Sequence, residues 1–163
     1  MATSPSAPLP LRLLLRIPVP WVFVLAYLAG AGWQRLLPLA TPAPRDRRAL
    51  AIAGILLWTL AVTLAGWALV LFRRRRTTTT PGEISRAFVA AGPYRLSRNP
   101  MYLGLVLAYL GEMFFLAQLA PLLPLLLVIA YLQWVVIPLE ESRLSAAFAA
   151  PYAQYAARVR RWL

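Results

Sequence analysis

The chain has 163 residues, 61% of them hydrophobic, and a net charge of +12 at pH 7. This is the composition of a membrane protein rather than of a soluble domain. All 17 basic residues are arginine, and histidine and cysteine are absent, which excludes lysine Schiff bases, cysteine nucleophiles, disulfides and the common zinc ligand sets, so we expect no metal site. We expect no nucleic-acid partner, because no basic soluble domain with interleaved aromatic residues is present.

Residues 1–72 predict two membrane helices. Residues 1–16, rich in Pro, Ser and Ala, predict a disordered arm, with a signal peptide as the alternative. An apolar run over residues 17–37 predicts the first helix, since a crossing needs ~20 apolar residues. The uncharged run at 49–72 predicts the second, with Gly54 and Gly66 available for close helix packing.

Four arginines follow the second helix at residues 73–76. The positive-inside rule predicts that this block stays in the cytoplasm. Fixing the topology is one interpretation of the block, and a catalytic role is the other. Residues 77–98 then predict a cytoplasmic loop, with a short amphipathic helix at the membrane interface over residues 83–91.

A long apolar stretch at residues 99–139 predicts a helical hairpin. As one helix it would be about 60 Å long at ~1.5 Å per residue, twice the ~30 Å membrane core. The chain must therefore cross twice, with helices at 99–117 and 122–138 and a turn where prolines suit the start of a helix. The single charge within it, Glu112, is either a functional acid or an acid near the far interface.

Residues 139–163 predict an amphipathic helical tail. Apolar and aromatic residues recur every three or four positions from Leu144 to Trp162, and Pro151 predicts a break. Three arginines lie off this stripe, namely Arg143, Arg158 and Arg161. The expected fold is therefore all-α, an integral membrane protein of one domain with about four transmembrane helices and a C-terminal helical tail.

The double crossing should bring two polar clusters to the same face of the membrane. The first contains Tyr94, Arg95, Arg98, Asn99 and Tyr102, and the second contains Glu140, Glu141, Tyr152 and Tyr155. One interpretation is a salt-bridge network, worth ~1 kcal/mol or less per exposed pair. The other is a pocket for a zwitterionic ligand, with arginine on a carboxylate, glutamate on ammonium or hydroxyl groups, and tyrosine stacked on a base. S-adenosylmethionine carries all of these groups, and its activated methyl group needs mainly alignment with an acceptor, so histidine and cysteine are not required.

The two clusters also carry a family resemblance. Before the hairpin stand Gly92, Pro93, Tyr94, Arg95, Arg98, Pro100, Tyr102 and Gly104, and after it stand Glu140, Glu141, Leu144, Phe148, Tyr152 and Tyr155. This pattern resembles the isoprenylcysteine carboxyl methyltransferase and phospholipid methyltransferase superfamily from Thr77 onward, whereas the N-terminal half resembles nothing specific. The resemblance implies an integral membrane methyltransferase that binds S-adenosylmethionine without a Rossmann domain. It also implies that Arg98, Tyr102, Glu140, Glu141 and Tyr155 line the cofactor pocket.

Asn99 departs from the family pattern, which has histidine in an Arg-His-Pro motif. An amide replaces one imidazole hydrogen bond but neither becomes cationic nor accepts a proton near neutral pH. The departure therefore favours an acceptor that is already ionised, such as a carboxylate. We take Arg98, Asn99 and Glu141 as the catalytic candidates, with Arg98 or a glutamate positioning the charged ends of the cofactor.

The sequence thus predicts an S-adenosylmethionine-dependent methyltransferase whose lipophilic acceptor is either like an isoprenylcysteine carboxylate or a phospholipid. The site should face the cytoplasm, and membrane lipids are the expected partners. Arginine without lysine suggests a prokaryote with a GC-rich genome, so the expected location is its cytoplasmic membrane. An NADPH-dependent reductase of the sterol-reductase type is the enzymatic alternative; it would need a binding site for an extra phosphate, which residues 73–76 do not exclude. A non-enzymatic membrane scaffold is the third possibility, and the oligomeric state is open.

Overall fold

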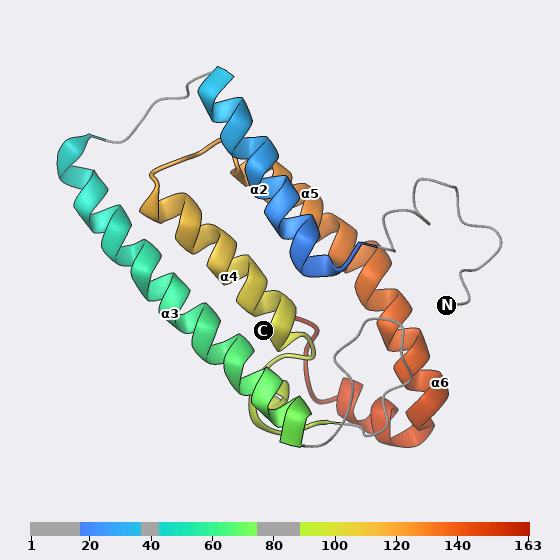
Figure 1. The fold of residues 1–163 in the computed structure, drawn as a ribbon. Helices are drawn as coiled ribbons and strands as arrows, with labels where there is room; N and C mark the ends of the chain where they lie inside the picture. The colour runs from blue at the N-terminus through green and yellow to red at the C-terminus, as the bar shows by residue number, and fades with distance from the viewer. Residues whose placement is uncertain (1–16, 37–42, 75–88) are drawn as a thin grey trace.

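The computed structural model describes residues 17–36, 43–74 and 89–163. The predicted arm at 1–16, and the part of the predicted interfacial helix before Val89, lie outside these ranges. The regular elements within them are α2 (Val19–Leu36), α3 (Pro44–Arg74), the 3₁₀ turn η1 (Gly92–Arg95), α4 (Pro100–Phe115), α5 (Leu122–Tyr131), the π-helical segment η2 (Leu132–Val136) and α6 (Ile137–Ala156) (Figure 1). All of these elements are helical, and the all-α prediction is confirmed.

Two helices of the described chain are long and apolar enough to cross a membrane, at Asp46–Leu71 and Leu122–Ala156. The apolar helix Pro100–Phe115 is shorter, about 24 Å at ~1.5 Å per residue. Together with the composition, these helices are those of an integral membrane protein.

Helices α3 and α4 lie side by side (Figure 1), and they pack closely because Gly54 and Gly111 face one another across the contact. A Cβ atom added at Gly54 would lie 2.6 Å from the Gly111 carbonyl oxygen and 2.7 Å from the Phe115 nitrogen. Small residues that let backbones approach are typical of helix pairs in membranes. At Gly66, the second glycine predicted to serve this purpose, an added Cβ would meet nothing within 4 Å, so Gly66 has no part in the contact.

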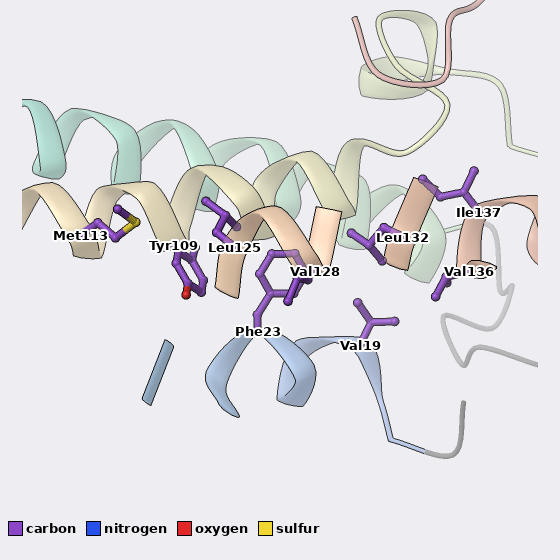
Figure 2. Close-up of a cluster of buried hydrophobic side chains, with 9 residues drawn as sticks. All are labelled: Val19, Phe23, Tyr109, Met113, Leu125, Val128, Leu132, Val136 and Ile137. Carbon is purple, nitrogen blue, oxygen red and sulfur yellow. The ribbon is translucent and has the colours of Figure 1, made fainter. Parts of the chain in front are cut away.

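The other side of α4 faces a core that α2 shares with the returning helix. Figure 2 shows Phe23 of α2 directed at Val128 and Leu125, with Tyr109 of α4 beside them. Burial of such side chains is the main force holding soluble cores, but within lipid it is close packing and polar contacts that join helices. The hairpin turn supplies one such contact, because the Tyr109 hydroxyl donates to the Pro121 carbonyl oxygen at 2.8 Å.

The returning helix continues past Pro138, where the sequence predicts that the crossing ends. Helix α5 passes without interruption through η2 into α6, with Pro138 in the first turn of α6. Proline lacks the N–H that an α-helix interior needs, and local widening to a π-helix is one way in which helices adjust their hydrogen bonding. The true bend comes later, at Ala149, whose φ of 31° and ψ of −110° are not helical.

Candidate functional site

The described part of the connection before α4, residues 89–99, contains a tight turn, and we call this part the loop. At the start of the turn Gly92 has a φ of +58°, and a Cβ there would lie 3.1 Å from the Trp67 ring of α3. Glycine suits this position because it adopts left-handed backbone conformations without strain and leaves room for the ring. The turn that follows buries Pro93 and Tyr94, and burial raises the pKa of the Tyr94 hydroxyl. The loop is thereby anchored on the end of α3.

The bend in α6 returns the end of the chain to this loop. Beyond Ala149 and Pro151, Tyr152 and Tyr155 are both buried. The Tyr155 hydroxyl donates to the Tyr94 carbonyl oxygen at 2.7 Å. The predicted break near Pro151 is thus a change of direction, and it carries both tyrosines to the start of α4.

We call residues 157–163 the carboxy-terminal segment. Its backbone is bound to the loop through three hydrogen bonds. The Arg98 N–H donates to the Arg160 carbonyl oxygen at 2.9 Å, while the Ser97 hydroxyl and the Asn99 Nδ2 group donate to the Arg161 carbonyl oxygen at 3.2 and 2.9 Å. Figure 1 shows this segment returning to the start of α4, so both polar clusters lie at one end of the helical hairpin.

Glu141 is the centre of an ion-pair cluster. One carboxylate oxygen lies 3.2 Å from Arg98 Nη1, and Arg161 donates to both oxygens at 3.1 and 2.6 Å. These hydrogen bonds to Glu141 raise the pKa of the Arg161 guanidinium. Arg98 Nη1 also lies 3.5 Å from the Tyr152 hydroxyl oxygen. One network therefore joins Arg98 of the loop to Glu141, Tyr152 and Arg161, which lie at least 43 positions later in the sequence.

Glu140 occupies a different environment from its neighbour. One of its carboxylate oxygens accepts a hydrogen bond of 2.6 Å from the Tyr102 hydroxyl. Within the described chain its second oxygen makes no further hydrogen bond. Of the two predicted acids, Glu141 therefore binds arginines, whereas Glu140 binds a tyrosine and keeps one oxygen available to accept.

The structure brings most of the predicted site residues together, but not all of them. The network and its surroundings contain Tyr94, Arg98, Asn99, Tyr102, Glu140, Glu141, Tyr152 and Tyr155. Arg95 instead lines a separate pocket with Arg158. Sequence reasoning missed Arg161 as the second partner of Glu141, and also Ser97, which is 1% exposed. The only sign in the sequence that Arg161 could bind an acid is its position off the apolar stripe of the tail.

Glu112 lies far along α4 from this network, as its sequence position predicts. It lines an apolar groove between α3 and α4, of about 590 Å³, with Trp58, Thr59, Thr63 and Phe115 among its neighbours. No hydrogen bond or ion pair joins its carboxylate to another described residue. It takes no part in the polar network at the other end of the hairpin.

The fold and the site thus define an all-α membrane protein with a polar network at one end of a helical hairpin. A family model described as phospholipid methyltransferase matches residues 49–150, more than half of the chain. The chain therefore belongs to the phospholipid methyltransferase family, a family of membrane methyltransferases, and the suspected relationship is confirmed. The match begins in α3, so the likeness extends upstream of Thr77. No curated protein and no solved structure gives a significant match.

Proposed function

We propose that the protein transfers a methyl group from S-adenosylmethionine to a lipophilic acceptor at the cytoplasmic face of the membrane. Beyond family membership, one observation carries the proposal. Arg98, at the start of the hairpin, and Glu141, at its end, are 3.2 Å apart. Polar side chains from both ends of the hairpin thus form a single cluster beside the lipid, where a soluble cofactor and a lipid acceptor can meet.

The residues of the cluster fit the cofactor. Arg98 Nε is buried and has no hydrogen-bond partner among the described residues. Leaving a buried donor unsatisfied costs ~1 to 3 kcal/mol, and more for a charged group. An anionic ligand such as a carboxylate would remove that cost, since guanidinium and carboxylate groups match in geometry.

The remaining roles follow from the chemistry of each side chain. Glu140 would accept a hydroxyl or ammonium hydrogen through its second oxygen, and the Tyr94, Tyr152 and Tyr155 rings would form the apolar wall for a base. When bound, S-adenosylmethionine supplies an activated methyl group. The chain itself supplies position and exclusion of water, which is most of what such a reaction requires.

Asn99 serves the site by holding it together. Its amide donates to the Arg161 carbonyl oxygen at 2.9 Å, so this side chain fixes the carboxy-terminal segment rather than moving a proton. An acceptor that is already ionised suits this arrangement, because no base is then needed at position 99.

Charge supports the cytoplasmic face. Helix α3 ends in Arg73 and Arg74 on the side of the loop that bears the cluster. An excess of arginine beside a membrane helix is typical of the cytoplasmic side. We place the four apolar segments across the membrane on this basis, with the cluster in the inner interface.

Titration calorimetry on the detergent-purified protein tests the proposal. We expect S-adenosylhomocysteine to bind and NADPH not to bind. Arg98→Ala and Glu141→Ala should each weaken binding by at least about tenfold, since a hydrogen bond to a charged group contributes ~1.5 to 3 kcal/mol. Arg160→Ala is the matched control, because that exposed side chain has no hydrogen bond or ion pair with another described residue. Binding of NADPH alone, or equal binding by all three variants, would refute the proposal.

A further inference from the structure

A second pocket lies beside the cluster and shares Tyr155 with it. Its volume is about 400 Å³, and its lining consists of Ala90, Arg95, Pro151, Tyr155, Arg158 and Val159. A volume of this order is at the small end of ligand pockets in proteins, which hold ~300 to 1,000 Å³. The pocket joins three parts of the chain, namely the loop before α4, the bent end of α6 and the carboxy-terminal segment.

The charges around this pocket all have one sign. Arg95 and Arg158 line it, and no acidic residue of the described chain does. Within the described chain, the ion pairs of the site go to Arg98 and Arg161, which share Glu141. Among the described residues, the Arg158 guanidinium donates only through Nε, to the Gln154 carbonyl oxygen at 3.1 Å, and this bond steadies it. Two neighbouring guanidinium groups repel each other unless an anion lies between them.

We propose that this pocket binds the phosphate group of a membrane phospholipid headgroup, with Arg95 and Arg158 as its two ligands. Guanidinium groups bind phosphate through paired, charge-assisted hydrogen bonds, and arginine is preferred wherever such planar recognition is needed. The apolar surfaces of Pro151 and Val159 suit the carbon atoms next to the phosphate. Arg95 would then bind lipid, not the cofactor to which its sequence position had assigned it.

A lipid in this pocket would also hold the site closed. Arg95 belongs to the loop and Arg158 to the carboxy-terminal segment, so one phosphate would bridge them. The segment carries Arg161, the bidentate partner of Glu141. Tyr155 is shared as well, since it lines the pocket and its ring centroid lies 6.3 Å from that of Tyr152. Phospholipid would therefore stabilise the cluster whether or not it is the methyl acceptor.

Native mass spectrometry and thermal unfolding of the detergent-purified protein test this inference. The probes are a phosphatidylglycerol, a diacylglycerol with the same acyl chains, and inorganic phosphate. We expect phosphatidylglycerol to bind and raise the unfolding temperature, and diacylglycerol to do neither. Binding of phosphatidylglycerol but not of inorganic phosphate would identify the membrane lipid as the source. Stabilisation by inorganic phosphate alone would overturn the assignment to a lipid.

Three variants of equal charge locate the binding. Arg95→Gln and Arg158→Gln should each weaken phosphatidylglycerol binding at least about tenfold, as expected for the loss of a charge-assisted hydrogen bond. Arg160→Gln, two residues from Arg158 and outside the pocket, should bind as the unmodified protein does. If Arg160→Gln lost as much affinity as Arg158→Gln, general attraction between basic surface and anionic lipid would explain the binding and the pocket would be refuted. Arg158→Gln should still bind S-adenosylhomocysteine, so failure here is distinguishable from failure of the methyltransferase proposal.

Discussion

The pairing of Glu141 with Arg161 can be measured by a double-mutant cycle of Glu141→Ala and Arg161→Ala. The two hydrogen bonds between them are 3.1 and 2.6 Å long, and the Arg161 and Glu141 side chains are 29% and 18% exposed. Fully exposed ion pairs contribute ~0.2 to 1 kcal/mol, whereas breaking a buried pair costs ~3 to 5 kcal/mol. A bidentate pair that is mostly shielded from water falls between these limits, so we expect a coupling free energy of about 1 to 2 kcal/mol.

The free energy of unfolding in mixed detergent micelles is the quantity to measure for the four proteins of this cycle. A second cycle, with Arg160→Ala in place of Arg161→Ala, is the control, because Arg160 contributes only its backbone carbonyl to the loop. Mutations that do not interact add to within ~0.3 to 0.5 kcal/mol. A coupling below about 0.5 kcal/mol in the first cycle would show that the ion pair does not hold the carboxy-terminal segment in place.

Four other substitutions test the helix contact and the site. Gly54→Ala would bring a Cβ within 2.6 Å of a carbonyl oxygen of α4 and should destabilise the protein by ~1 to 3 kcal/mol in denaturation, whereas Gly66→Ala should be neutral or stabilise it by up to ~1 kcal/mol. Equal losses would contradict the glycine contact. Tyr102→Phe removes the 2.6 Å hydrogen bond to Glu140 and should cost ~1 to 3 kcal/mol by the same measurement; an unchanged unfolding free energy would show the bond to be unimportant. Asn99→Ala removes the shorter of the two hydrogen bonds to the Arg161 carbonyl oxygen and leaves only that from Ser97, so it should speed removal of the carboxy-terminal segment in limited proteolysis; an unchanged cleavage rate would show that the remaining bonds suffice.

The hairpin and the meeting of the two polar clusters could be predicted from the sequence because both follow from length. An apolar stretch about twice as long as the membrane core has to return to the side on which it began. The contact between Arg98 and Glu141, at 3.2 Å, follows from that topology. Residue types then indicated the chemistry, since arginine, glutamate and tyrosine at such a border suit a polar ligand.

The course of the chain after the hairpin could not be predicted in the same way. The bend depends on Ala149, whose φ of 31° is rare for a residue with a Cβ atom. Alanine gives no signal of such a bend, and Pro151 indicates a break but not the new direction. The partners of Arg161 and Ser97 depend on that direction, which is why they were missed. Likewise, Pro138 predicts an end to the crossing helix. The helix continues instead, because the π-helical turn before Pro138 adjusts the hydrogen bonding that the proline would otherwise break.

That π-helical turn, η2 (Leu132–Val136), also sets the rotational phase of everything after it. A π-helical turn holds about one residue more than an α-helical turn, and each residue of an α-helix advances the side chains by about 100° around the axis. Deleting a single residue here would make the helix more regular, yet it would swing Glu140 and Glu141 away from Tyr102 and Arg98. The orientation of both acids thus depends on one extra residue in a segment that lies about one turn before them and contains no charged side chain.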